Sequence, residues 1–331
     1  MKAVIMTERP QNIDAVYSEN FKKKLAAELD MLPQCVSKDE LISREDMRGV
    51  EIIFSTWGMI RLTKEEIKTY LPMLKAVFYA AGTVQYFARP FIESGVRVFS
   101  AWAANGVPVA EIAASEIILA NKGFFTRRVK RRSEWSNDDP QRNYPGNFGT
   151  KVGLLGAGMI GRGVIERLKS TDLDVYVYDP FLTDDAAAHL GVKKASLDYI
   201  FENCNVISNH IANKEETKGM INKTHFDKMG QYAVFINTGR GAQVVEADMI
   251  AALKEVPTRT ALLDVTDPVE PPEENSELYN MDNVFLTPHI AGSTGNECYR
   301  LAEYMYDEYK AFASGLPAKY EVTEKMLSTM A

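Results

Sequence analysis

The sequence predicts an α/β protein made of two domains, each built on a parallel β-sheet, and three observations lead to this. The chain has 331 residues, which is too long for one ordinary hydrophobic core. Strand-like apolar runs alternate with helical patterns from the start, as in parallel α/β layers. A glycine-rich turn lies near the midpoint, at Gly156–Gly161, so about 150 residues of another fold precede it.

The first hundred residues are expected to form a small α/β unit of their own. Helical spacing occurs at 20–29 and at 63–70. The second of these helices opens with Thr63 as N-cap and Glu66 three residues later, the pattern of a capping box. Strands of this unit are expected at 2–6, 51–55, 76–79 and 97–100.

A long apolar helix is expected at 107–124, and because it is apolar on nearly every side it should be buried between the two domains. Glu111, Ser115 and Glu116 interrupt its apolar stretch, which we expect to be too short to span a bilayer. The polar, turn-rich residues 133–150 then predict a connecting loop.

The glycine turn has the surroundings that a dinucleotide-binding site requires. An apolar strand, 151–155, precedes Gly156, Gly158 and Gly161, and a helix follows. The first glycine permits a tight turn, the second lets the backbone approach a pyrophosphate, and the third lets helix pack on strand. The next strand, 174–178, ends in Asp179, which is placed to accept hydrogen bonds from ribose hydroxyls. We therefore predict a Rossmann-like cofactor domain.

The second half of the chain continues the same pattern. A helix is expected at 245–254, and a last helix at 295–314 should cross back to the first domain to bury its apolar face. The predicted substrate domain is 1–103 with 295–331, the predicted cofactor domain is the inserted 104–294, and a cleft is expected between them. Further strands are expected at 205–208, 233–237, 259–264 and 283–287.

Composition excludes several classes of protein. Apolar residues make up 46% and charged residues 25%, as in soluble globular proteins. The net charge of −7 argues against nucleic acid as the main partner, although 127–132 is a basic run. The three cysteines are far apart and have no metal-binding spacing, which suits a reducing compartment. The first residues are typical of a strand and not of a signal peptide. We expect a cytoplasmic protein with no metal and no membrane contact.

Three polar side chains follow predicted strands, where they would face a crevice. Arg240 follows 234–239, Glu270 follows 263–269, and His289 follows 284–288. A guanidinium binds a planar carboxylate with two parallel hydrogen bonds. An imidazole exchanges a proton near neutral pH, and a neighbouring carboxylate orients it. Beside a nicotinamide, these groups suit the reduction of an anionic carbonyl compound.

With these motifs the chain resembles, over nearly its whole length, the D-isomer-specific 2-hydroxyacid dehydrogenase family. The similarity is most specific over 156–161, 236–241, 263–265 and 287–292. It implies an NAD-dependent enzyme that acts on a small 2-hydroxy or 2-oxo acid, and a homodimer formed through the long helix and residues 127–147. It also implies that Arg240, Glu270 and His289 are the catalytic residues. The turn formed by Ala81, Gly82 and Thr83 would bind the substrate carboxylate, and Arg240 and His289 would also bind the substrate. The implied cofactor-binding residues are Gly156, Gly158, Met159, Ile160, Gly161, Asp179, His210, Thr217, Thr238, Arg240, Asp264, His289 and Gly292.

Two departures from the family pattern leave alternatives open. Glu270 lies six residues after Asp264 where the family usually has five, so Val269 looks inserted and Asp267 is an alternative partner for His289. The segment 210–213 also lacks a proline that the family often has. Relatives with this fold act as NAD-sensing corepressors, which is the alternative function. A formate-type enzyme is disfavoured because that branch carries glutamine at the position of Glu270. The identity of the 2-hydroxy acid stays open.

Overall fold

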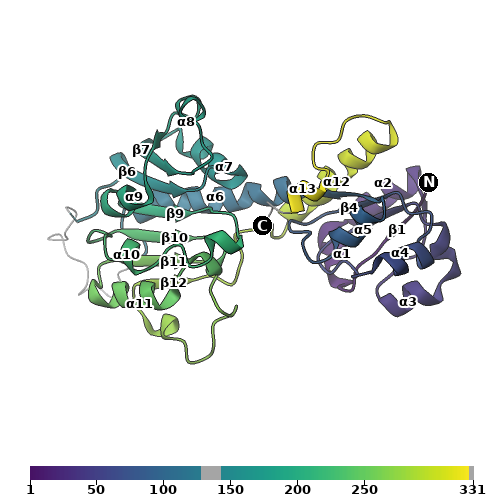
Figure 1. Ribbon diagram of the computed structural model, residues 1–331, viewed down its shortest axis with the longest axis horizontal. Helices are drawn as coiled ribbons and strands as arrows, with labels where there is room; N and C mark the ends of the chain where they lie inside the picture. Colours follow the sequence, from purple (N-terminus) through teal and green to yellow (C-terminus); the bar gives the residue numbers. More distant parts are fainter. Residues whose placement is uncertain (128–142, 328–331) are drawn as a thin grey trace. The chain divides into compact units, whose positions relative to one another are not determined.

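The computed structural model describes residues 1–127 and 143–327. The chain divides into two compact α/β units: residues 1–106 together with those from Ser293 onward, and residues 107–292 (Figure 1). The boundaries expected from the sequence, 103/104 and 294/295, lie within three residues of these. The second unit is thus inserted into the chain of the first.

The first unit is built on a five-stranded parallel sheet in the order β2-β1-β3-β4-β5. The four strands predicted here are present within one residue of their expected ends, and the two-residue β2 is an addition. Strands β3 and β4 are buried on both faces, which explains why their sequences are continuous apolar runs. The bounds are β1 (Lys2–Ile5), β2 (Asp30–Met31), β3 (Ile52–Ser55), β4 (Ala76–Tyr79) and β5 (Arg97–Ser100).

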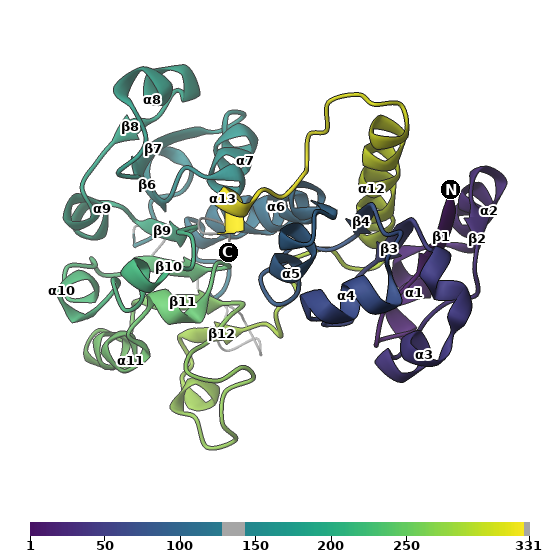
Figure 2. The same cartoon turned by 45° about the vertical axis from the view of Figure 1, so that its right-hand side comes forward.

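Helices cover both faces of this sheet (Figures 1 and 2). One face buries α1 (Gln11–Val16), α2 (Glu19–Glu28) and α12 (Glu297–Ala313), which is the expected last helix. The predicted capping box of α4 is present, because Thr63 and Glu66 each bond the other's backbone N–H, at 2.9 and 3.2 Å. The other face carries α3 (Lys38–Ser43), α4 (Lys64–Tyr70), α5 (Ala88–Glu93) and α13 (Glu324–Leu327).

The long helix α6 spans Trp102–Ala120, so the expected range 107–124 was wrong at both ends. The helix continues through Pro108, whose ring removes only one backbone hydrogen bond. It ends before Gly123, which has φ +66°. With 19 residues it is long and apolar enough to cross a membrane, contrary to our expectation. Half of its most apolar window is buried within the protein.

The second unit is built on a seven-stranded parallel sheet in the order β12-β11-β10-β9-β6-β7-β8. All six predicted strands are present, and β8 is an addition. The glycine-turn strand begins three residues earlier than expected, at Phe148. The bounds are β6 (Phe148–Leu155), β7 (Asp172–Tyr178), β8 (Lys193–Lys194), β9 (Val206–Asn209), β10 (Val234–Asn237), β11 (Thr260–Leu263) and β12 (Val284–Leu286).

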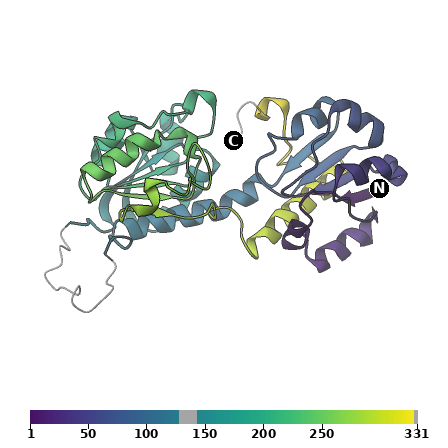
Figure 3. The same cartoon turned by 90° about the horizontal axis from the view of Figure 1, so that it is seen from below.

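Two layers of helices enclose this sheet (Figure 3). One face packs against α6, α7 (Met159–Leu168) and α8 (Asp184–Leu190). The opposite face packs against α9 (Leu197–Asn203), α10 (Lys223–Phe226) and α11 (Glu246–Glu255). Most of the predicted connecting loop and of the basic run at 127–132 lies outside the described residues.

Candidate active site

The strand order of the second unit creates a switch point between β6 and β9. The chain runs outward from β6 to β8 in one direction and from β9 to β12 in the other. In open parallel sheets, ligands bind outside the carboxyl ends of the strands at such a point. The predicted residues Gly156, His210, Thr238, Asp264 and His289 each follow one of these strands, and therefore lie at one edge of the sheet.

The three glycines of the turn have three different environments. Gly156 has φ +99°, and a Cβ there would lie 2.7 Å from the carbonyl oxygen of His210. A Cβ on Gly161 would lie 2.1 Å from the carbonyl oxygen of Gly156. Around Gly158, by contrast, a Cβ would meet nothing within 4 Å, and this residue begins α7 without a side-chain cap. The open space and the helix N–H groups at Met159 and Ile160 suit a pyrophosphate.

Asp179 lies beside this turn at the end of β7. Its Oδ2 accepts a hydrogen bond from the N–H of Ala157 at 2.7 Å, and its Oδ1 accepts from the N–H of Phe181 at 2.8 Å. The two backbone contacts hold the carboxylate over the glycine turn. Its role toward ribose hydroxyls remains a prediction.

Buried polar atoms without protein partners gather after β9 and β10. His210 Nδ1, Asn213 Oδ1 and Thr238 Oγ1 have no hydrogen-bond partner among the described residues. Burial lowers the pKa of His210 to about 4, so its imidazole is neutral near pH 7. Thr217 holds the same loop through the N–H of Lys214 and the carbonyl of Ala212. Unsatisfied buried groups are costly, and a polar cofactor at this edge would satisfy them.

The glycine turn, the fixed acid and these unpaired atoms together fit a dinucleotide. Within residues 1–127 and 143–327, by comparison, no group of three or more His, Cys, Asp or Glu side chains is arranged to hold a metal ion.

His289 and Glu270 are in contact. The Nδ1 atom of His289 lies 2.5 Å from Oε1 of Glu270, and their side chains are 47% and 38% exposed. His289 has φ +53°, a left-handed conformation that sequence patterns did not reveal. The extra residue Val269 is accommodated by a turn in which Thr266 Oγ1 donates to the Val269 carbonyl at 2.8 Å. The insertion therefore leaves Glu270 within reach of His289.

Arg240 is placed by a network of buried amide side chains that the sequence analysis did not single out. Asn209 Nδ2 donates to Asn237 Oδ1 at 3.1 Å and to Gln243 Oε1 at 2.8 Å. Asn237 in turn donates to the carbonyl of Arg240 at 3.1 Å. The available signal was a polar residue at the end of each apolar strand, β9 and β10. Burial lowers the pKa of Arg240, and the negative charge of Glu270 opposes this shift.

Asp264 holds the segment that carries His289. Its Oδ1 accepts from Thr287 Oγ1 at 2.6 Å and from the N–H of Ile290 at 2.8 Å. Its Oδ2 accepts from the N–H of Ala291 at 2.8 Å. These bonds fix the backbone on both sides of His289, so Asp264 acts as a positioning residue in addition to its implied role in cofactor binding.

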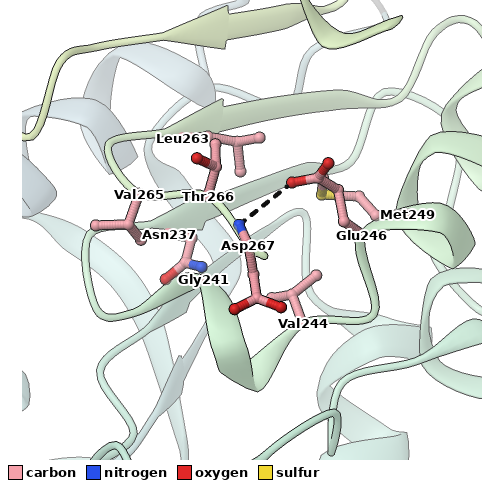
Figure 4. A pocket seen from close by; sticks show the side chains of 9 residues that line it. All are labelled: Asn237, Gly241, Val244, Glu246, Met249, Leu263, Val265, Thr266 and Asp267. Carbon is pink, nitrogen blue, oxygen red and sulfur yellow. Dashed lines mark hydrogen bonds between the residues drawn. The ribbon is translucent and has the colours of Figure 1, made fainter. Parts of the chain in front are cut away.

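A small pocket lies where the segment after β10 meets the segment after β11 (Figure 4). A Cβ on Gly241 would lie 2.0 Å from the carbonyl oxygen of Thr266, so the two backbones touch where only glycine fits. The N–H of Asp267 donates to Glu246 Oε2 at 3.4 Å, drawn as the dashed line. The pocket is lined by Asn237, Gly241, Val244, Glu246, Met249, Leu263, Val265, Thr266 and Asp267.

The predicted substrate turn lies in the first unit, after β4. The N–H of Ala81 bonds the carbonyl of Tyr79 at 2.9 Å and is therefore not available to a ligand. In the described chain, the N–H groups of Gly82 and Thr83 make no backbone hydrogen bond. Ser100 Oγ donates to the carbonyls of Ala81 and Gly82, at 3.0 and 2.7 Å. The turn thus has two free donors on a fixed backbone.

Glu116 on α6 is a titratable group that the predicted chemistry does not use. Its Oε2 atom is buried without a hydrogen-bond partner in the described part of the chain. Burial, and after it the negative charge of Asp264, raises the pKa of Glu116 from 4.5 to about 7. Because the pKa of Glu116 is higher in the folded than in the unfolded state, its contribution to stability is full at pH values below the unfolded-state pKa. This contribution is lost as the pH rises through the folded-state pKa.

We therefore expect the stability of Glu116→Gln relative to the wild type to be greater at pH 8 than at pH 5. One pKa unit corresponds to 1.36 kcal/mol, so the relative gain in unfolding free energy should be at most about 3 kcal/mol. Urea unfolding at both pH values measures it. Glu111→Gln, on the same helix and ion-paired with Arg167, is the control. An equal pH trend in both variants would contradict the assignment.

Comparisons with known proteins agree with this architecture. Residues 117–291 match the family model described as "D-isomer specific 2-hydroxyacid dehydrogenase, NAD binding domain". The chain is 30% identical to a D-3-phosphoglycerate dehydrogenase of Archaeoglobus fulgidus, over 70% of this chain and 43% of that protein. It is also 30% identical to that of Haemophilus influenzae, over 80% and 64%. The matches thus span about half the length of these relatives.

Solved structures share the fold over nearly the full chain. A phosphoglycerate oxidoreductase from Rhizobium etli superposes with a TM-score of 0.82 at 17% identity, covering 99% of both chains. A D-lactate dehydrogenase with NAD⁺ from Lactobacillus jensenii gives 0.74 at 20% identity, covering 98% of this chain and all of that one.

Proposed function

The chain belongs to the D-isomer specific 2-hydroxyacid dehydrogenase family, and from this premise we propose that it is an NAD-dependent oxidoreductase. It would interconvert a small D-2-hydroxy acid and its 2-oxo acid. The observation that carries the proposal is the 2.5 Å contact between His289 and Glu270. Arg240 lies within electrostatic range of this pair, at the sheet edge where the glycine turn fits a dinucleotide.

The residues of the chain divide the chemistry among them. The bound cofactor supplies or accepts the hydride at C2 of the substrate. Arg240 would hold the carboxylate and the carbonyl oxygen with two parallel hydrogen bonds. Glu270 would accept a hydrogen bond from the Nδ1–H group of His289, which leaves Nε2 to exchange a proton with the substrate oxygen. In the direction of reduction, Nε2 of the charged imidazole would donate its proton to the carbonyl oxygen, and Glu270 would stabilise the charged imidazole before this transfer.

The proposal is tested by NADH oxidation with a panel of 2-oxo acids, including pyruvate, glyoxylate and 3-phosphohydroxypyruvate. We expect turnover of at least one acid, a D-2-hydroxy product, and a clear preference for NADH over NADPH. The preference follows because Asp179 would repel a 2′-phosphate, and neither Pro180 nor Phe181 offers a positive charge to offset this repulsion. NADH binding without turnover of any acid would favour a cofactor-sensing protein instead.

The partner of His289 can be identified by matched substitutions. Glu270→Gln should lower kcat for oxo-acid reduction by about 10²-fold, because an amide no longer stabilises the charged imidazole. Asp267→Asn should leave kcat within about threefold, because Glu270 and not Asp267 contacts His289. Steady-state kinetics at saturating NADH provides both values. A large loss in the Asp267 variant alone would assign the role to Asp267.

We also propose a two-fold homodimer, with the contact expected at the long helix and residues 127–147. Residues 128–142 of that contact lie outside the described residues, and the end of α6 and the start of β6 flank them. Phe124 and Phe148 are 58% and 84% exposed there, and a two-fold dimer is the commonest soluble oligomer. Light scattering should report about twice the chain mass of 37.1 kDa. Replacing both phenylalanines by serine should shift the mass toward that of one chain, whereas Phe181→Ser, which changes an equally exposed residue elsewhere, should not. A wild-type mass of one chain at micromolar concentration would refute the dimer.

A further inference from the structure

Residues 318–327, here called the closing segment, extend the sheet of the first unit at β5. Ser100 donates its N–H to the carbonyl of Tyr320 at 3.1 Å, and Val322 donates to the carbonyl of Val98 at 2.7 Å. Phe99 and Glu321 form an antiparallel bridge between these bonds. The closing segment thus covers the backbone of β5.

Side chains hold the closing segment along its length. Glu308 on α12 is 3% exposed, and its carboxylate accepts from the N–H groups of Lys319 and Tyr320 at 3.1 Å. Arg97 binds Glu321 with two parallel hydrogen bonds, at 2.8 and 2.6 Å. A charge-assisted pair and a buried carboxylate with two donors are strong constraints. The segment is therefore a fixed part of this unit.

The closing segment reaches the predicted substrate turn by two routes. Directly, Gln85, which lies two residues after Thr83, donates from its Nε2 to the carbonyl of Leu327 at 2.7 Å. Indirectly, the segment bonds the backbone of Ser100, whose hydroxyl bonds the carbonyls of Ala81 and Gly82. Val84 and Leu327 are also buried in the same hydrophobic cluster. The turn is thus held by groups on both sides of its two free N–H donors.

We propose that the closing segment positions the Gly82–Thr83 turn for the substrate carboxylate, with Gln85 as the positioning residue. The inference rests on the proposed function, and on the implied role of this turn toward the carboxylate of the same substrate. Two backbone N–H groups bind a carboxylate well only when their directions are fixed beforehand. The contacts between the closing segment and the Gly82–Thr83 turn involve neither the glycine turn nor Arg240. Their loss should therefore affect binding of the acid and not of the cofactor.

The test is Gln85→Met, which keeps the length of the side chain and removes the donor to Leu327. We expect KM for the preferred 2-oxo acid to rise about three- to tenfold, the effect of one neutral hydrogen bond. The kcat and the NADH dissociation constant should stay within twofold. Hydrogen exchange of the protein without ligands should become faster at the Ala81 amide of this turn, which is bonded to the carbonyl of Tyr79.

Glu303→Gln is the matched control, because it removes an exposed ion pair with Lys24 from the same unit without touching the closing segment or Gln85. It should change neither KM nor exchange at the turn. The proposal is overturned if Gln85→Met leaves KM unchanged, or if both variants raise KM equally. Should the wild type reduce no 2-oxo acid, the proposed function fails, and hydrogen exchange alone decides. Faster exchange at the turn only in Gln85→Met would support the positioning role of Gln85, and unchanged exchange in that variant would overturn it.

Discussion

His289→Ala is expected to lower kcat for oxo-acid reduction by about 10²- to 10⁴-fold, the usual contribution of a positioned general acid. The alanine variant keeps Arg240 and the other predicted cofactor-binding residues, but it lacks the imidazole whose Nε2 would protonate the carbonyl oxygen. Affinity for NADH should be nearly unchanged, because His289 is one of many implied cofactor-binding residues and the glycine turn and Asp179, which lie after other strands, are retained. Stopped-flow reduction and NADH fluorescence titration measure the two quantities separately.

His189→Ala is the control for this variant. His189 is exposed on α8, and its Nδ1 contacts the carbonyl of Asp185, in the same turn of that helix. Its replacement should leave kcat and the NADH dissociation constant unchanged. Turnover of His289→Ala within a few-fold of the wild type would show that another group supplies the proton.

Arg240→Gln is expected to lower kcat/KM for the oxo acid by about 10²- to 10⁴-fold. Hydrogen bonds to charged groups contribute about 1.5–3 kcal/mol each, and the substitution removes two of them. Arg240→Lys keeps the charge but loses the planar fork, so it should recover only part of the loss. The loss should be smaller for a substrate analogue without a carboxylate, because that analogue never made the paired contact.

Arg167→Gln tests whether any arginine of this unit would have the same effect. Arg167 is paired with Glu111 on the surface of α7 at 3.0 Å, and its replacement should change kcat/KM by less than about threefold. If Arg240→Gln lost equal efficiency with and without the substrate carboxylate, Arg240 would have a structural role and not a binding one.

Much of the fold could be predicted because its signals are local. The alternation of apolar strands with helical spacing reports a parallel sheet, and the capping box at Thr63 and Glu66 is formed as expected. The glycine turn could also be recognised, since Gly156 and Gly161 each lie against a backbone carbonyl of the same turn or of the residue after a neighbouring strand. The ends of α6 were missed, because burial and not local propensity allows a helix to continue through Pro108.

The candidate site could be predicted only in part. Arg240, Glu270 and His289 are far apart in the sequence, and a residue inserted before Glu270 left two carboxylates as possible partners of His289. The loop geometry around Val269 selects Glu270, through the bond from Thr266. The left-handed backbone of His289, and the bonds of Asp264 on either side of it, depend on the pairing of β11 with β12.

The sequence by itself determined the α/β class, the strand order along the chain, the place of the glycine turn and the residue types available for chemistry. These follow from periodicity and from the backbone freedom of glycine, which are properties of short segments. The tertiary structure alone decided which carboxylate meets His289, which N–H groups of the predicted substrate turn are free, and which buried amides place Arg240. Those outcomes depend on contacts between distant segments, whose distances no local pattern encodes.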